Sequence, residues 1–226
     1  MLGWFLMKPE TSIEDINWLL ARSAAFDAGY AFVTSYDALE KNGSTGQILA
    51  AIKRWEEARM NRVFNEQQKT LMEDVNNEFL LERKEDNTLL LTRVHPYRIN
   101  HENIQRQPGE PVSSSMDFEN FGDEQVVQFI LSAKKCDVIN PQIEFDGTKL
   151  TTIPVKINDG EHLKFDGQYA KVYSSSWQLL KSIVLNKDVL RIGPGQHSIE
   201  VRCEFMGIEG KMATELRIIG KKEIIK

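Results

Sequence analysis

The hydrophobic positions near the start of the chain recur with helical spacing. They predict one amphipathic helix over about residues 12–26 and a second over about 44–63. Thr11 to Glu14 and Ser44 to Gln47 both have the spacing of a capping box, which marks the start of a helix. The residues that mark one face of each helix are Ile13, Ile16, Leu19, Leu20 and Ala24 in the first and Ile48, Leu49, Ile52, Trp55 and Arg59 in the second.

A short apolar run precedes each of these helices. Residues 1–7, MLGWFLM, are apolar almost throughout, and residues 30–36, YAFVTSY, are rich in aromatic and β-branched side chains. Both runs are typical of short buried strands. The predicted order is therefore strand, helix, strand, helix, which favours parallel strands joined by a right-handed crossover.

Two strands are too few for an ordinary parallel sheet, because such sheets have further strands and helices on both faces. We therefore expect residues 1–7 to be an interior strand of something larger. In this interpretation the N-terminal part is the end of an α/β domain whose earlier strands are missing from this chain or come from another chain. The alternative is a small α/β layer that packs its helices onto the downstream sheet and is complete as it stands.

The pattern changes after residue 63. Asn65 to Gln68 has cap spacing and is followed by apolar residues that suggest a short helix or turn. Residues 78–94 read as two strands around a polar turn at 84–87. Residues 95–115 contain three prolines and many polar side chains, so we expect an exposed connection with some strand at its ends.

The remainder of the chain contains short strand signals separated by turns. Asp146-Gly147 and Asp166-Gly167 are typical hairpin turns. In the run at 197–205, apolar residues alternate with polar ones, which indicates a strand with one buried face. The predicted strand regions are 126–133, 142–157, 162–174, 183–192, 197–205 and 213–225.

These elements predict an α+β fold with two parts. Residues 1–76 form an N-terminal βαβα segment. Residues 77–226 form an antiparallel β-sandwich of the jelly-roll-like kind, with an irregular connection near 95–115.

Two stretches resemble a known family. The run WLLARSAAFDAGYAFVTSYDALEKNGSTGQILAAIKRWEEAR resembles the closing strand and helices of a (β/α)8-barrel glycoside hydrolase of polysaccharide-degrading bacteria. The run LRIGPGQHSIEV resembles late strands of the β-sandwich appended to such barrels. The resemblance implies that residues 1–76 correspond to the last βα units of the barrel, while about three quarters of a barrel would be absent.

Charge and hydropathy exclude some classes of partner. The formal net charge is −5 and the isoelectric point is near 5.5, so the chain lacks the basic surface of a nucleic-acid-binding protein.

No run approaches eighteen consecutive apolar residues, and we expect no membrane span. The first residues lack the basic region and cleavage site of a secretory signal. The cellular compartment stays open, although the resemblance implies a periplasmic or secreted parent protein.

The reactive residue types show no arrangement typical of a metal, redox or cofactor site. The four histidines form neither HExxH nor paired metal spacing, and no phosphate-binding glycine loop or G-x-S-x-G motif occurs. Cys136 and Cys203 lie far apart without a C-x-x-C pattern. We expect two buried thiols, with a single disulfide as the alternative, and neither a metal nor a cofactor.

No catalytic pair can be assigned from this sequence. Glycoside hydrolysis needs two carboxyl groups roughly 5 to 10 Å apart, and the resemblance implies that they lie on earlier barrel strands. If the barrel interpretation holds, side chains after the two N-terminal strands face the pocket. The alternative for each is ordinary loop chemistry or helix capping. These barrel-mouth candidates are Lys8, Glu10, Ser35, Tyr36 and Asp37.

Aromatic side chains are the candidates for carbohydrate binding, because sugars place their apolar faces on flat rings. Trp177 lies in a polar setting, SSSW, and is the strongest candidate, with Tyr169 and Tyr173 on the strand before it. The alternative for Trp177 is a core or lid position in the sandwich. Trp4, Trp18 and Trp55 are expected to pack in cores.

Three hypotheses of function follow. The chain is the non-catalytic C-terminal portion of a glycoside hydrolase-like protein, or a carbohydrate-binding module with a glycan ligand. In the third hypothesis it is a stand-alone structural or interaction protein that forms homo-oligomers through its N-terminal strands.

Overall fold

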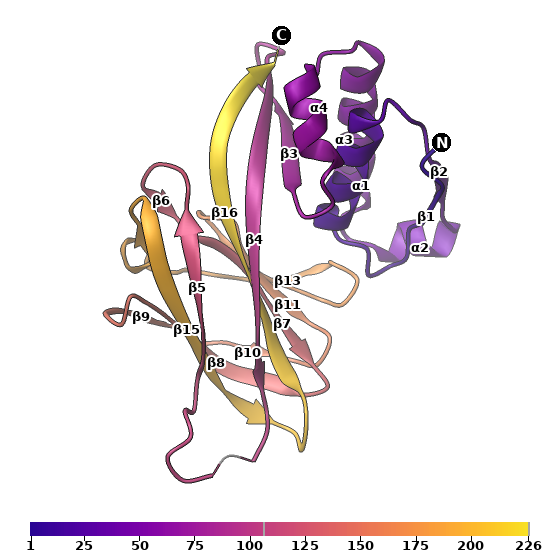
Figure 1. The fold of residues 1–226 in the computed structure, drawn as a ribbon. Helices are drawn as coiled ribbons and strands as arrows, with labels where there is room; N and C mark the ends of the chain where they lie inside the picture. The colour runs from indigo at the N-terminus through magenta and orange to yellow at the C-terminus, as the bar shows by residue number, and fades with distance from the viewer. Residues whose placement is uncertain (106, 226) are drawn as a thin grey trace. The chain divides into compact units, whose positions relative to one another are not determined.

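The computed structural model describes residues 1–105 and 107–225 and has a mixed α+β fold (Figure 1). The chain forms two compact units. The first comprises residues 1–95, 176–178 and 220–225, and the second comprises 96–175 and 179–219. The fold class predicted from the sequence is confirmed. The prediction divides the chain after residue 76, whereas the first compact unit extends to His95 and takes in two later segments.

The first unit opens with a parallel strand pair. β1 (Trp4–Leu6) and β2 (Ala31–Val33) form a two-stranded sheet among the described residues, with Trp4 opposite Ala31 and Leu6 opposite Val33. The predicted strand–helix–strand order, with parallel strands, is therefore confirmed.

The helices of the first unit are α1 (Ile13–Ala25), α2 (Tyr36–Lys41), α3 (Thr45–Met60) and α4 (Glu66–Glu73). The helix α1 packs against both α3 and α4 (Figure 1). Their core includes Trp55, which stacks on Phe64 with ring centroids 5.7 Å apart. The expected packing role of Trp55 is thus confirmed. The sequence did not predict α2, which begins at Tyr36, the last residue of the run expected to be a strand.

The helix starts differ from the predicted caps in two places. The capping box of α1 joins Ser12 to Asp15, one residue later than predicted. The physical reason is that the Thr11 hydroxyl instead accepts a hydrogen bond of 2.9 Å from the Lys8 amide, which closes the turn after β1. Ser44 precedes α3 but makes no side-chain capping bond.

The third predicted cap forms as expected. At the start of α4, the Asn65 side chain accepts from the Gln68 amide at 2.8 Å, and the Gln68 side chain accepts from the Asn65 amide at 3.1 Å.

Two strands follow α4, as predicted. They are β3 (Glu78–Arg83) and β4 (Leu89–Glu102), and they pair in antiparallel fashion. β4 continues well into the segment expected to be an irregular connection. There Tyr97 and Ile99 pack against the core of the second unit. Their alternation with polar residues is hard to recognise in the sequence, because Pro96 and charged residues lie nearby.

Most strands from β3 onward form two antiparallel sheets. The five-stranded sheet has the order β10–β8–β15–β5 with β9 beside β8, and the seven-stranded sheet has the order β13–β12–β11–β7–β16–β4–β3. The long last strand, β16 (Lys211–Ile225), spans both units. The other strands are β5 (Ser114–Asn120), β6 (Gln125–Val126), β7 (Gln128–Lys134), β8 (Asp137–Phe145), β9 (Lys149–Thr152), β10 (Lys156–Ile157), β11 (His162–Phe165), β12 (Ala170–Tyr173), β13 (Leu179–Ile183), β14 (Arg191–Ile192) and β15 (Gly195–Met206).

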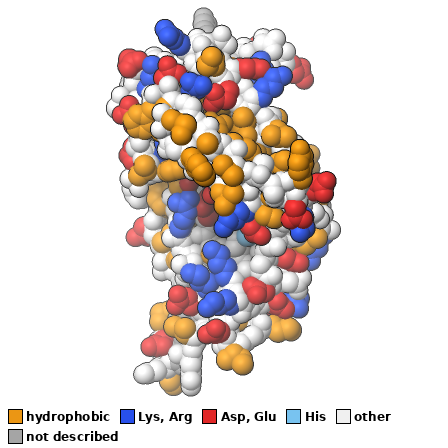
Figure 2. Space-filling view, turned by 90° about the vertical axis from the view of Figure 1, so that its right-hand side faces the viewer, with side chains coloured by type: hydrophobic (Ala, Val, Ile, Leu, Met, Phe, Trp, Pro, Cys, Tyr) orange, Lys and Arg blue, Asp and Glu red, His pale blue; other side chains and the backbone are white. Residues whose placement is uncertain are grey.

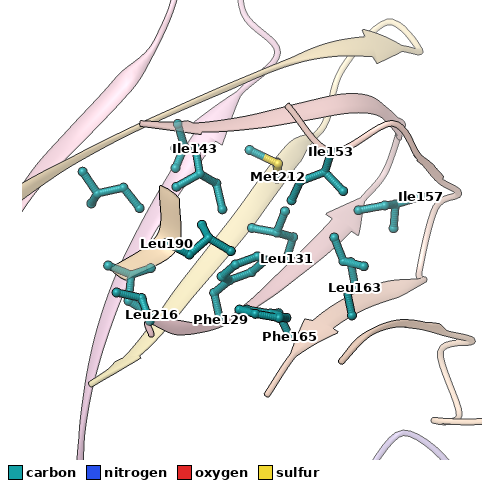
Figure 3. Packing of buried hydrophobic residues seen from close by; sticks show 14 of the residues in the cluster. Phe129, Leu131, Ile143, Ile153, Ile157, Leu163, Phe165, Leu190, Met212 and Leu216 are labelled. Carbon is teal, nitrogen blue, oxygen red and sulfur yellow. The ribbon is translucent and has the colours of Figure 1, made fainter. Parts of the chain in front are cut away.

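Apolar side chains from both sheets fill the space between them (Figure 3). Leu131 and Phe165 come from the seven-stranded sheet, and Ile143 comes from the five-stranded sheet. Because the two sheets share one continuous core, this unit is a β-sandwich.

Both predicted Asp-Gly turns connect antiparallel strands. Asp146 and Gly147 join β8 to β9 with φ angles of 54° and 66°, as a tight hairpin turn requires. The turn with Gly167 joins β11 to β12.

One strand prediction needs correction. The region 183–192 is interrupted by a turn of 3-10 helix at Asp188–Leu190, whose start is held by the Asn186 side chain. The alternation predicted for 197–205 is confirmed in β15: Ile199 and Val201 are buried, and Cys203 and Phe205 pack against the same core. The register with β8 shifts between Arg202 and Glu204.

Candidate functional site

The parallel pair β1–β2 has one covered face and one open face. On the covered face, Phe5 and Phe32 stack with ring centroids 6.1 Å apart and pack against the core of the first unit. On the open face, Trp4 is 81% exposed and Leu6 is 56% exposed. Trp4 is therefore not a core residue, contrary to expectation. Figure 2 shows hydrophobic side chains gathered on the face of this unit that carries β1 and β2.

The two strands also have unpaired sides. Within the described part of the chain, β1 pairs only with β2 and β2 pairs only with β1. Each strand thus presents main-chain N–H and C=O groups on its other side, where a further strand can pair. We call the surface formed by Trp4, Leu6 and Val33 the open face of the parallel pair.

The residues after β1 lie at the carboxyl end of this pair. Lys8 and Glu10 are exposed, and both belong to the turn that precedes α1. The ladder extends to Met7, whose amide donates to Val33 O at 2.9 Å. The two strands therefore end at the same edge of the sheet.

The residues after β2 begin α2. The Ser35 side chain caps that helix by accepting from the Ala38 amide at 3.1 Å. Asp37 forms an ion pair of 2.8 Å with Lys41, and its hydrogen bond and charge raise the pKa of Lys41. Tyr36 is 88% exposed. Ser35 thus has the alternative role considered for it, helix capping, and Asp37 is paired within α2.

The connection after α2 is tied to the connection after β1 by Asn42. This residue is buried, and its side-chain amide donates to Pro9 O at 2.9 Å and to Thr11 O at 2.8 Å. Its side-chain oxygen accepts from the Ser44 amide at 2.8 Å. This cross-link was missed from the sequence, because its two acceptors lie 33 and 31 positions earlier in the chain.

The segment Ser176–Gln178 is fastened to the same edge. The Gly43 amide donates to Ser176 O at 2.8 Å, and the Gln178 side chain donates to Lys41 O at 3.0 Å. The Trp177 indole Nε1 donates to Glu10 O at 2.9 Å. We call this segment the edge clamp, because it holds the two connections from a distant part of the sequence.

The three carbohydrate-binding candidates have different environments. Trp177 is 7% exposed, so its ring offers almost no free surface. Tyr169 is 55% exposed, and the Lys171 ammonium lies 5.4 Å from its ring centroid. Tyr173 is partly buried at the end of β12. Trp177 belongs to the first compact unit, whereas both tyrosines belong to the second.

Arg22, in α1, is a buried polar residue that the sequence did not single out. Its guanidinium donates to Trp18 O at 3.2 Å and to Asn77 O at 2.5 Å, and it also donates to Asp74 O. It lies 4.6 Å from the Trp18 ring centroid. Burial lowers the pKa of Arg22, while the charges of Asp74 and Glu78 oppose that shift. The Trp18 indole donates to Val75 O at 2.8 Å, so this cluster ties α1 to the segment after α4.

The two cysteines are free thiols rather than a disulfide. Cys136 is buried and Cys203 is partly buried. Burial raises the pKa of Cys203 to about 12 and also raises that of Cys136. Both thiols are therefore poor nucleophiles at neutral pH.

Among residues 1–105 and 107–225, no group of three or more His, Cys, Asp or Glu side chains is arranged to hold a metal ion. None of the helices in this described part is long and apolar enough to cross a membrane. Comparison of the chain with protein-family models, with curated proteins and with solved structures finds no match.

Proposed function

We propose that this chain is the non-catalytic C-terminal portion of a glycoside hydrolase-like protein. In this proposal β1 and β2 join the parallel strands of a larger α/β domain, and the β-sandwich supports that domain or binds carbohydrate. The observation that carries the proposal is the open face of the parallel pair, where Trp4 and Leu6 are exposed on a strand that is apolar on both sides.

The physical argument concerns the two faces of β1. Strands of parallel sheets are apolar on both faces because both faces are covered in the assembled domain. Here the helical core covers Phe5 but leaves Trp4 and Leu6 in water. Burying a side chain of leucine size stabilises an assembly by about 1.5–3 kcal/mol. An α/β domain docked on this face would bury Trp4 and Leu6 and gain this contribution. Its strands would also form hydrogen bonds with the main-chain groups on the unpaired sides of β1 and β2.

The same observation supports one alternative function. A second copy of the chain could cover the open face and pair with the strand edges, which would make this an interaction protein that forms homo-oligomers. In both cases the docking surface is the same, but the occupant differs.

Association with a barrel domain tests the proposal. The chain is mixed with a (β/α)8 glycoside hydrolase domain truncated after its sixth βα unit, and the mass is measured by size-exclusion chromatography with light scattering. We expect a one-to-one complex that Trp4→Asp or Leu6→Asp abolishes. The matched control is Ile208→Asp, which changes a fully exposed apolar residue of the second unit.

The outcomes separate the two functions. A dimer of the chain alone that is lost in Trp4→Asp supports the homo-oligomer instead. If the chain stays monomeric at high concentration and does not bind the truncated barrel, neither a barrel domain nor a second copy docks on β1–β2.

A further inference from the structure

Two turns of the second unit border a surface pocket. One turn follows β7, and the other belongs to the hairpin that joins β15 to β16. The pocket has a volume of about 360 Å³ and is lined by Lys134, Lys135, Glu209, Gly210 and Lys211. All five residues belong to the second compact unit, so the pocket lies within that unit.

A glycine and a hydrogen bond hold the two turns in place. A Cβ atom on Gly210 would lie 2.5 Å from Cys136 Sγ and 2.7 Å from Lys134 O, so only glycine fits where the hairpin crosses the first turn. Gly210 also has a φ angle of 141°, which favours glycine. The Lys135 amide donates to the Asp159 carboxylate at 2.7 Å, which fixes the first turn. The pocket is therefore preorganised by the fold.

Three lysines give this pocket an excess of positive charge. Lys134 and Lys211 lie directly opposite each other in the ladder between β7 and β16. Like charges in this arrangement destabilise a sheet, and an anion bound between them would relieve the repulsion. Lys135 supplies the third ammonium group, and its Nζ lies 4.0 Å from the carboxylate of Glu209. The described lining thus sets three cations against one carboxylate, in a chain whose net charge is −5.

Two further carboxylates lie close to the first turn but outside the lining. Asp137 pairs with Lys156 at 2.7 Å and accepts from the Asp159 amide at 3.0 Å. Asp159 in turn accepts from the Lys135 amide. Both carboxylates are therefore engaged by other donors, and the lining itself keeps its excess of positive charge.

Exposed apolar side chains adjoin the pocket. Ile208 lies in the turn of the hairpin and is 100% exposed, and Met206 in the same hairpin is 56% exposed. Ile104 is also exposed and follows Asn103, whose amide donates to Gly210 O at 2.9 Å. Side chains of this kind gain free energy when they leave water for an apolar medium.

A cationic pocket beside exposed apolar side chains matches an anionic phospholipid at a membrane surface. The phosphate oxygens accept charge-assisted hydrogen bonds from ammonium groups. Apolar side chains next to them enter the boundary between the head groups and the acyl chains. A phosphate compound in solution would contact the lysines but leave Ile208 in water, whereas a phospholipid uses both features of the site.

We propose that this pocket binds the phosphate group of an anionic phospholipid, with Lys134, Lys135 and Lys211 contacting the phosphate and Ile208 entering the membrane surface. The second unit then attaches the chain to one face of a membrane, which requires no membrane-spanning segment. This inference goes beyond the proposed function and does not depend on it, because the open face of β1–β2 takes no part in it.

Flotation with lipid vesicles tests the inference. The full chain is mixed with vesicles of phosphatidylcholine alone or of phosphatidylcholine with phosphatidylglycerol. We expect binding to the anionic vesicles only, and we expect salt to weaken it by screening. Replacing both Lys134 and Lys211 by Gln should weaken this binding by about tenfold or more. Ile208→Asp should weaken it to a similar extent, because a carboxylate replaces the inserted apolar group.

Two control variants separate the pocket from other causes. Lys164 and Lys171 also lie directly opposite each other in the ladder between β11 and β12, and neither lines the pocket. Replacing both by Gln removes the same charge and should leave most of the vesicle binding intact. Trp4→Asp should also bind normally, because Trp4 lies on the open face of the parallel pair.

Isothermal titration with inorganic phosphate distinguishes a soluble ligand from a lipid. We expect phosphate in solution to bind much more weakly than the anionic vesicles. If phosphate bound through Lys134 and Lys211 while the vesicles did not bind, the ligand would be a soluble phosphate compound and the membrane proposal would be wrong.

Three other results would overturn the inference. They are the absence of binding to anionic vesicles at low salt, equal losses in the two double lysine variants, and a loss of binding in Trp4→Asp. Equal losses would show that net charge acts rather than the pocket, and the third result would place the membrane contact on the open face. Failure of the chain to associate with a barrel domain would contradict only the proposed function.

Discussion

The indole of Trp177 donates a hydrogen bond to the main-chain oxygen of Glu10, 167 positions earlier in the chain, at a distance of 2.9 Å. The sequence nominated these residues for separate roles, Trp177 as a sugar platform and Glu10 as a barrel-mouth residue. Their contact shows that the edge clamp and the turn after β1 form one structure. Trp177 contributes its ring to packing and its N–H to the backbone of that turn.

Trp177→Ala should destabilise the protein strongly. It removes a buried aromatic ring together with the bond to Glu10 O, and truncating a buried tryptophan costs about 3–5 kcal/mol. Trp177→Phe should cost less, because it keeps most of the apolar surface and loses mainly the hydrogen bond. Urea unfolding followed by circular dichroism measures both. A free energy of unfolding within 1 kcal/mol of wild type for Trp177→Ala, a difference small against the cost of losing a buried ring, would contradict the packing role.

Gly43→Ala and Gly46→Ala should have opposite effects. A Cβ on Gly43 meets the Trp177 carbonyl oxygen at 2.3 Å, so the edge clamp must shift, at a cost of about 1–3 kcal/mol. Gly46 lies in α3, and a Cβ there has no neighbour within 4 Å. Alanine at this helical position should stabilise the protein by about 0.5–1 kcal/mol. Thermal melts of the two variants test this. Equal shifts in the same direction would contradict the prediction.

Arg22→Leu should lower the free energy of unfolding by about 2–4 kcal/mol. The variant keeps much of the apolar volume but leaves the carbonyl oxygens of Trp18, Asp74 and Asn77 without the donor that they share. Arg62→Leu is the control, since Arg62 is an exposed residue of the same type. Denaturant titration of both variants gives the comparison. If they unfold at the same urea concentration, the Arg22 cluster is not a stabilising tie.

Stability at acid pH should depend on Asp146. Burial tends to raise the pKa of this carboxyl group, but hydrogen bonds from His197 and the Ser198 amide, together with nearby positive charge, lower it below its ordinary value of 3.8. Because the folded pKa is lowered, the stabilisation is complete above about pH 4 and is lost as the pH falls through the folded pKa. The group is partly exposed, so screening keeps the effect small.

Asp146→Asn removes this titration. We expect the variant to show a shallower loss of stability than wild type when melting temperatures are compared below pH 4. Asp123→Asn, at a site where no such network is described, serves as the reference. If the melting temperature of Asp146→Asn fell below pH 4 as steeply as that of wild type, Asp146 would not be the group whose titration lowers stability.

The thiols should react slowly in the folded protein. Cys136 is buried, and the pKa of Cys203 is raised to about 12 by burial, so little thiolate exists at pH 8. A chromogenic disulfide reagent should titrate two thiols in denaturant and label the native protein only on the time scale of unfolding. If the reagent titrated no thiol even in denaturant, the two cysteines would form a disulfide.

Local sequence signals predicted most of the individual elements. Helical periodicity and caps located α1, α3 and α4, because these features involve residues within one or two turns of each other. Asp-Gly pairs located the hairpins at Asp146 and Gly167, because those turns need positive φ angles that few other residues adopt. The one-residue error at Ser12 arose where Thr11 had a second acceptable partner, the Lys8 amide.

The sequence by itself therefore determined the fold class, the strand–helix–strand order and the antiparallel sandwich. Only the tertiary structure decided that Trp4 is exposed and Trp177 is buried, since the sequence predicted a core position for Trp4 and left both environments open for Trp177. The burial of a side chain depends on which distant segments cover it, and no local pattern encodes the approach of Ser176–Gln178 to Gly43 and Glu10. The edge clamp and the open face of the parallel pair are products of long-range packing for this physical reason.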